Sequence, residues 1–326
     1  MNATSDAPAV PVAEVKNLTV RFPVNNARNT LRALNDVSLS VTEGETLGVI
    51  GESGCGKSTL ARVLVGLQKP TQGGLKLDGW DPWAASATEL RRRRAAYQIV
   101  FQDPGAAFNP RMTIGRSLLE PLELQRQGSA PDREKCTLAM LDRVGLPARY
   151  ATRYPHELSG GQKQRANLAR ALTLQPRLIV CDEVVAALDV SIQAEVVNLL
   201  IDLQQEIGLT YVFISHDLAV VAHLSERIAV MYLGALVELG PASEVARAPQ
   251  HPYTSALHFA APELMPSHLR GTRPPPLQGE LPSPLAPPSG CVFRTRCPKA
   301  AALCAQKAPE WRMVNAQHGV ACHFAP

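Results

Sequence analysis

A glycine-rich segment near the start of the chain constrains its fold more than any other feature. Residues 51–58 read GESGCGKS and match the pattern G-x4-G-K-[ST]. The apolar run 46–50 predicts a strand before this loop, and the apolar period of 57–67 predicts a helix after it. A strand, a glycine-rich loop and a helix in this order begin an α/β fold with a parallel sheet.

The loop has the composition of a phosphate-binding site. Glycines let backbone N–H groups turn toward an anion, and the N-terminus of the following helix adds a favourable dipole. We expect Lys57 to reach the β- and γ-phosphates of a nucleotide and Ser58 to offer its hydroxyl to Mg²⁺. The predicted nucleotide-binding residues of this segment are Gly51, Ser53, Gly54, Cys55, Gly56, Lys57, Ser58 and Thr59. Lys57 and the helix N-terminus both lower a neighbouring thiol's pKa, so the sequence also predicts a reactive Cys55.

A second apolar run ends in two acids. Residues 178–181 predict a buried strand, and Asp182 and Glu183 follow it directly. We expect Asp182 to hold Mg²⁺ through water and Glu183 to orient or deprotonate an attacking water. Together with the loop, this acid pair indicates hydrolysis of a nucleotide.

The segment 158–162, LSGGQ, stands ahead of a predicted helix over 163–174 and resembles the signature motif of ATP-binding cassette ATPases. In that family the motif of one subunit caps the γ-phosphate that the loop of another subunit holds. The chemistry agrees, because a hydroxyl, glycine N–H groups and a helix N-terminus all favour an anion. The resemblance therefore implies ATP as the nucleotide, and it assigns the nucleotide-binding residues Ser159, Gly160, Gly161 and Gln162.

Other family motifs follow in the expected order. Gln102 matches the Q-loop and is implied as a catalytic residue and Mg²⁺ ligand beside Ser58 and Asp182. Asp189 matches the D-loop, which contacts the nucleotide site. His216 matches the switch histidine and is implied, with Glu183, as catalytic. A final assignment concerns the adenine: Phe22 stands where these ATPases stack an aromatic ring on the base.

Three further segments resemble the oligopeptide/dipeptide importer ATPases, a group that also serves nickel, glutathione and other small solutes. They are FNPRM at 108–112, YPHE at 154–157 and HPYT at 251–254. Within this group the chain is most similar to the second of two non-identical ATPases. The resemblance implies a paralogous ATPase partner in a heterodimer, two transmembrane permease subunits and an extracytoplasmic solute-binding protein. The sequence does not name the transported solute.

The resemblance and the pattern of elements together predict a P-loop NTPase core with a mostly parallel sheet, a helical subdomain and a small Cys-rich appendage. Residues 1–11 are expected to be disordered, and 12–262 to form the nucleotide-binding domain. The helical subdomain is expected at about 103–160. Seven prolines between Pro274 and Pro288 indicate an extended linker over 263–289, followed by the Cys-rich region 290–326.

One segment departs from the family. The usual proline and serine just after the catalytic glutamate are replaced here by Val184 and Ala186. The proline would fix φ and the serine would offer a hydroxyl, in a loop that crosses the dimer interface in relatives. Two readings stay open: an active ATPase, and a low-turnover ATP-binding subunit in an asymmetric pair.

Four of the seven cysteines fall in the last 36 residues: Cys291, Cys297, Cys304 and Cys322. Their spacing lacks the tight C-x2-C pairs of zinc fingers, and it resembles the tail of some peptide-importer ATPases that bind a [4Fe–4S] cluster. Three alternatives stay open: the cluster, a zinc ion with help from His318 or His323, and reduced cysteines without a ligand.

Charge and hydropathy restrict the partners and the cellular location that can be expected for the chain. A net charge of only +4 argues against a dedicated nucleic-acid binder, so no nucleic-acid partner is expected. Residues 1–15 show no secretory signal, and no stretch approaches the roughly 18–20 apolar residues of a membrane span. We therefore expect a peripheral protein on the cytoplasmic face of the cell membrane.

Ribosome-bound and DNA-repair cassettes fit poorly, because the chain has one cassette with only 108 positions from Gly51 to Ser159.

Overall fold

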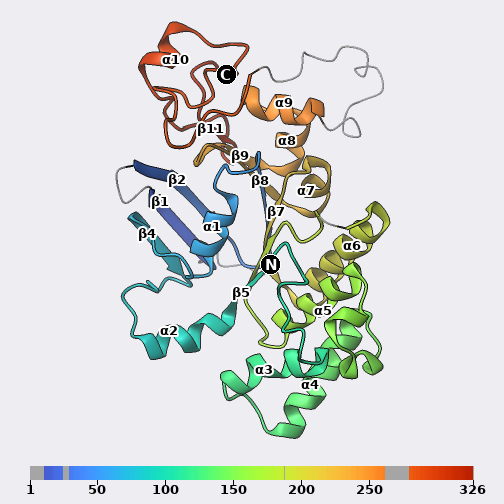
Figure 1. Ribbon diagram of the computed structural model, residues 1–326. Coiled ribbons are helices and arrows are strands. Elements are labelled where there is room, and N and C mark those ends of the chain that lie inside the picture. Colours follow the sequence, from blue (N-terminus) through green and yellow to red (C-terminus); the bar gives the residue numbers. More distant parts are fainter. Residues whose placement is uncertain (1–10, 25–28, 187, 261–278, 326) are drawn as a thin grey trace, which may run out of the picture.

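The computed structural model describes residues 11–24, 29–186, 188–260 and 279–325 (Figure 1). Its largest element is an eight-stranded sheet in the order β10-β11-β9-β8-β3-β7-β6-β5. The strands are β3 (Thr46–Ile50), β5 (Tyr97–Val100), β6 (Leu178–Asp182), β7 (Thr210–Ser215), β8 (Arg227–Tyr232), β9 (Ala235–Pro241), β10 (Arg312–Met313) and β11 (Gly319–Val320).

Five neighbouring strands of this sheet run parallel, as the strand–loop–helix motif predicts. In sheet order they are β8, β3, β7, β6 and β5. Every residue of β3, β6 and β7 is buried, which explains why these strands read as unbroken apolar runs. Strands β9, β11 and β10 extend the sheet in antiparallel pairing. The parallel part therefore places the ends of β3, β7, β6 and β5 along one edge.

A separate three-stranded antiparallel sheet has the order β2-β1-β4. It consists of β1 (Ala13–Val24), β2 (Asn29–Val41) and β4 (Gln72–Leu77), and helix α1 (Lys57–Leu64) contacts all three strands. Apolar side chains of this sheet, of α1 and of β3 form one hydrophobic core. Helix α1 ends three residues before the end of the predicted helix 57–67, because Gly66 takes a positive φ of 68°.

The segment after β5 is helical, as its sequence predicts. Helices α3 (Ile114–Leu124), α4 (Ala130–Arg143) and α5 (Gly160–Leu172) pack against one another and form one end of the molecule in Figure 1. Short helices flank them: α2 (Ala87–Arg93), η1 (Arg94–Ala96), η2 (Ala148–Thr152) and η3 (Pro155–Glu157). Helices α6 (Val190–Ile207) and α7 (Leu218–Leu224) follow β6 and β7.

The C-terminal region lies at the opposite end of the molecule, with its last segments in red in Figure 1. It contains α8 (Ala242–Arg247), α9 (Pro252–Ala260), α10 (Ala302–Gln306) and the β10–β11 hairpin. The hairpin adds to the main sheet, with Gly319 opposite Leu239 and Val320 opposite Glu238. Phe293 packs on Tyr232 of β8, at 5.1 Å between ring centroids. The Cys-rich region is thus joined directly to the ATPase core.

Most of the N-terminal segment 1–11 and of the linker 263–289 lies outside the described residues. Among the helices that are described, none has the length and apolar character to cross a membrane.

Candidate functional site

The phosphate loop wraps around the side chain of Lys57. The Lys57 ammonium donates hydrogen bonds to the carbonyls of Gly51 at 2.7 Å and Glu52 at 3.1 Å, and only 4% of the residue is exposed. Gly56 precedes α1 with a φ of 106°, and a Cβ there would lie 2.3 Å from the Ala33 carbonyl oxygen. Only glycine fits this position, so the glycine before the lysine in the pattern has a steric origin.

The loop meets the acid pair at the start of α1. The Ser58 hydroxyl donates a hydrogen bond to Asp182 at 3.2 Å. Burial raises the pKa of Asp182, and the hydrogen bond from Ser58 opposes that shift. A hydroxyl and a carboxylate side by side are the hard oxygen donors that Mg²⁺ prefers, so these residues fit the predicted metal.

Glu183 lies beside the loop in an unusual backbone conformation. Its φ is 53°, and its N–H donates to the Ile214 carbonyl of β7 at 3.0 Å. A non-glycine residue held there costs on the order of 1–3 kcal/mol and marks functional sites. One Glu183 carboxylate oxygen lies 3.7 Å from the Lys57 ammonium, and a fifth of the side chain is exposed. The predicted base therefore faces the predicted phosphate ligand.

Gln102 and His216 lie past the carboxyl ends of β5 and β7, and both are exposed. Because β3, β7, β6 and β5 are neighbours in the parallel sheet, these residues share one edge with the phosphate loop and the acid pair. Phe22 is half-buried near the end of β1 and packs partly on the core around α1. Asp189 is exposed at the N-cap of α6, and its side chain makes no cap hydrogen bond.

The signature residues begin α5 in the helical group. The Ser159 hydroxyl accepts a hydrogen bond from the Gln162 N–H, and the Gln162 side chain accepts one from the Ser159 N–H. This capping box leaves Ser159 and Gly160 exposed at the helix N-terminus. Gly161 is buried, and a Cβ there would lie 2.5 Å from Ile192. Helix α5 packs on α3 and α4, whereas α1 packs on strands of the two sheets.

The structure does not favour the predicted reactivity of Cys55. The residue is 1% exposed, and burial raises the pKa of its thiol, although Lys57 acts in the opposite direction. Desolvation of the thiolate is therefore stronger than the attraction of the ammonium. Cys55 packs in the core around α1, so its position in the loop is structural.

The structure adds two residues to the loop's surroundings to which the sequence analysis assigned no role. The Tyr253 hydroxyl accepts a hydrogen bond from the Glu52 N–H at 2.8 Å. The Arg296 guanidinium pairs with both oxygens of the Glu52 carboxylate, at 2.8 and 2.9 Å. Tyr253 lies in the HPYT segment, so a signal existed for it. Arg296 stands among the tail cysteines, where no pattern singles it out.

The four tail cysteines lie in one region without forming a metal cage. Cys291, Cys304 and Cys322 are buried and Cys297 is half-buried, and all four thiols are free. The Cys291 N–H donates to the Cys304 carbonyl at 2.7 Å. Within the described ranges, however, no group of three or more His, Cys, Asp or Glu side chains is arranged so that it could hold a metal ion. This geometry does not support an iron–sulfur cluster or a zinc ion.

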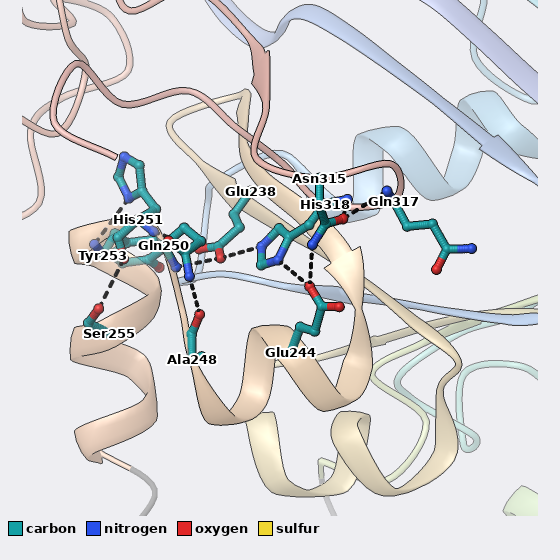
Figure 2. Close-up of polar contacts among 10 residues, drawn as sticks. All are labelled: Glu238, Glu244, Ala248, Gln250, His251, Tyr253, Ser255, Asn315, Gln317 and His318. Carbon is teal, nitrogen blue, oxygen red and sulfur yellow. Dashed lines mark hydrogen bonds and ion pairs between the residues drawn. The ribbon is translucent and has the colours of Figure 1, made fainter. Parts of the chain in front are cut away.

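His318, considered above as a zinc ligand, instead joins the tail to the core (Figure 2). Its two ring nitrogens contact the carboxylates of Glu238 at 2.8 Å and Glu244 at 2.9 Å. Glu238 is fully buried and also accepts hydrogen bonds from the N–H groups of Gln250 and His251. Hydrogen bonding to Glu238 raises the pKa of His318 despite burial. The other candidate ligand, His323, contacts the carbonyl of Lys307 through Nε2.

Comparisons with known proteins agree with this site. Residues 34–186 match the family model "ABC transporter", and residues 237–304 match "Oligopeptide/dipeptide transporter, C-terminal region". The chain is 51% identical to the oligopeptide transport ATP-binding protein OppF of Salmonella typhimurium, over 99% of this chain and 98% of that protein. The OppF protein of Escherichia coli is 49% identical, over 99% of this chain and 98% of its own length.

Solved structures show the same fold. A dimeric, post-hydrolysis structure of the ATP-binding cassette MJ0796, bound to ADP and Pi, matches with a TM-score of 0.64 and 32% identity. That match covers 71% of this chain and 98% of the other. The chain therefore belongs to the ATP-binding cassette transporter ATPases and carries the C-terminal region of the oligopeptide/dipeptide transporter group.

Proposed function

We propose that this chain hydrolyses ATP to power the import of di- and oligopeptides, or related small solutes, across the cytoplasmic membrane. The observation that carries the proposal is the contact between Lys57 and Glu183. It sets a phosphate-binding ammonium and a carboxylate base on either side of one site, at the edge of the parallel sheet. The likeness to OppF proteins supports peptides as the solute class.

In this proposal the phosphate loop and Lys57 hold the β- and γ-phosphates of ATP. Ser58, Asp182 and Gln102 would hold Mg²⁺, and the ion would supply positive charge beside the transferred phosphoryl group. Glu183 takes a proton from the attacking water. His216 lies at the same sheet edge, where its imidazole contacts the γ-phosphate. Phe22 stacks on the adenine, and Asp189 contacts the site from the start of α6.

The exposed signature residues support a site shared between subunits. Ser159 and Gly160 present a hydroxyl and a helix N-terminus to the outside of the chain, ready to bind an anion held elsewhere. We infer that they cap ATP in the loop of a second ATPase, and that a paralogous subunit caps ATP in this loop. Two permease subunits and an extracytoplasmic solute-binding protein complete the transporter, with this chain on the cytoplasmic face.

Low turnover is the alternative that the altered loop after Glu183 favours. Val184 is 2% exposed and packs in the core, so the segment is fixed by burial instead of by a proline ring. Glu183 keeps its contact with Lys57, which supports turnover. Phosphate release by the assembled transporter separates the two readings. A rate that Glu183→Gln does not change would identify the low-turnover subunit.

The domain layout also remains a proposal, with a nucleotide-binding domain over 12–262, a helical subdomain at about 103–160 and a Cys-rich region over 290–326. An iron–sulfur cluster in that last region is a separate hypothesis. Its support is the gathering of four free cysteines in one region. Among the described residues no group of side chains could hold a metal ion, which does not favour the cluster, and metal analysis decides the matter.

Two experiments test the transport proposal. The chain, isolated with an affinity tag from membranes, should bring down a paralogous ATPase, two permeases and the solute-binding protein. The reconstituted transporter should then take up labelled di- or oligopeptides in the presence of ATP. Uptake of nickel or glutathione in place of peptides would identify one of those solutes as the transported one. Isolation without any membrane subunit would contradict an importer.

A further inference from the structure

Glu52 is an acid inside the loop that is proposed to hold a triphosphate. Its backbone carbonyl accepts a hydrogen bond from Lys57, so it lies in the first turn of the loop. A carboxylate in a phosphate-binding loop repels the negative charge of bound phosphates, unless a cation offsets it. The phosphate-loop pattern leaves this position open to any residue, so the acid needs its own explanation.

Arg296 supplies the compensating charge. Its Nη1 lies 2.8 and 2.9 Å from the two Glu52 carboxylate oxygens and 3.5 Å from the Tyr232 hydroxyl. The Arg296 side chain is only 9% exposed and the Glu52 side chain 27%, so water screens the pair only partly. Removing one partner of such a sheltered pair leaves an uncompensated charge, which is costly.

Tyr253 holds the backbone of Glu52. The Glu52 N–H donates a hydrogen bond to the Tyr253 hydroxyl, which links the loop backbone to the C-terminal region. Tyr253 is fully buried against Tyr232 and Phe293, with centroid distances of 4.8 and 5.4 Å. This aromatic cluster gives the hydroxyl a rigid support. The backbone N–H and the side-chain carboxylate of Glu52 are thus both held by residues that come after strand β8 in the sequence.

We propose that Arg296 and Tyr253 are positioning residues for the ATP reaction, which act on the phosphate loop through Glu52. Arg296 offsets the Glu52 charge and holds the carboxylate in place, and Tyr253 fixes the backbone of the loop's first turn. The C-terminal region then contributes to nucleotide affinity without touching the nucleotide. The inference rests on the proposed ATPase function.

The test measures dissociation constants for a fluorescent ATP analogue and melting temperatures of the full-length chain. Arg296→Ala should weaken binding about tenfold, because it leaves the negative charge of Glu52 uncompensated in the loop proposed to hold the phosphates. In a Glu52→Gln background the same substitution should change the dissociation constant little, since no charge remains to be offset. Tyr253→Phe keeps the ring and should weaken binding about 2- to 10-fold. The matched control is Arg294→Ala, at a neighbouring arginine whose side chain donates its hydrogen bonds, within the described part of the chain, to Ser289.

Dependence on Glu52 is the deciding readout, because a general loss of stability would weaken binding in both backgrounds alike. Equal losses in the two backgrounds, or wild-type affinity in Arg296→Ala, would overturn the inference. Arg294→Ala should bind the analogue as wild type does, and a loss equal to that of Arg296→Ala would also count against it. The proposed function has a separate check: wild type should bind the analogue and Lys57→Ala should bind it more weakly. Failure of that check overturns both.

Discussion

The ammonium of Lys57 and a carboxylate oxygen of Glu183 lie 3.7 Å apart, although β3 and β6, which lead to them, are not neighbours in the sheet. Strand β7 separates the two, and the Glu183 N–H is anchored to Ile214 of that strand. The positive φ of Glu183 turns its side chain toward the loop instead of along the strand. One strained residue thus brings the base and the phosphate ligand together.

Glu183→Gln should keep ATP binding and lower hydrolysis about 10²- to 10⁴-fold, the usual effect of losing a general base. Glutamine has nearly the same shape, and it no longer holds Lys57 by charge. Phosphate release and nucleotide affinity are measured on the assembled transporter, with Glu195→Gln on the surface of α6 as the control. A normal turnover rate would show that the transporter does not depend on Glu183 as a base, which is the outcome that the low-turnover alternative expects.

Lys57→Ala should instead weaken ATP binding itself, whereas Glu183→Gln keeps binding and lowers hydrolysis. The ammonium is 4% exposed and directed into the loop, so its removal takes away charge-assisted hydrogen bonds to the phosphates. A loss of about 10- to 100-fold in affinity is expected. Isothermal titration with ATP measures it, and an affinity equal to wild type would contradict the loop's assignment.

Ser159→Arg tests the shared site. Ser159 is exposed on α5, away from the loop helix α1, so the substitution should leave ATP binding by this chain intact. It should impair hydrolysis at the loop of the partner ATPase, because the arginine fills the space of the γ-phosphate. Photolabelling of each subunit with an azido-ATP, together with the turnover rate, gives the two readouts. Loss of labelling on this chain itself would contradict a site built from two subunits.

Much of the site could be predicted because its residues follow local patterns. Gly56, Lys57 and Ser58 are adjacent in sequence: sterics require the glycine, and phosphate and Mg²⁺ binding call for the lysine and the hydroxyl. Asp182 and Glu183 follow a buried apolar strand, which the sequence shows directly. Parallel pairing then brings these two segments together without any further signal.

The remaining contacts depend on tertiary structure that no local pattern reports. Arg296 reaches Glu52 across 244 positions, and the β11–β9 pairing that seats the tail involves only two residues of each strand. The raised pKa of the Cys55 thiol could not be read from the sequence for a related reason. Its pKa depends on burial, which only the packed fold supplies, and burial is stronger there than the visible neighbour Lys57.

Cys55 should therefore react slowly with N-ethylmaleimide. The half-buried Cys136 and Cys297 should be modified first, since access limits alkylation more than their own raised pKa values do. Mass spectrometry of peptides after timed alkylation gives the order, and Cys55→Ser shows whether any inhibition depends on this residue. Early labelling of Cys55 that ATP prevents would restore the reactive-thiol prediction.

The tail's attachment should weaken at alkaline pH. The pKa of His318 is raised by Glu238, so its contribution to stability is complete below about 6.5 and is lost as pH rises through the raised value. The pKa of Glu244 is lowered by Asn315 and His318, so its contribution is lost only in acid. His318→Gln should therefore lower the melting temperature most near pH 6 and much less near pH 9. His323→Gln is the control, and a pH-independent difference would contradict the ion-pair assignment.

The tail cysteines give the last prediction, in which two roles lead to different mutational patterns. If the cysteines act by packing, the cost of replacement follows burial. Cys291→Ala and Cys304→Ala should then lower the melting temperature, while half-buried Cys297→Ala should change it little. If four thiolates hold a [4Fe–4S] cluster, loss of any one ligand should be equally damaging. The described geometry favours the packing pattern, together with a colourless protein after anaerobic purification. About four irons and four acid-labile sulfides per chain would contradict this expectation and establish the cluster, and one zinc per chain would establish the alternative metal site.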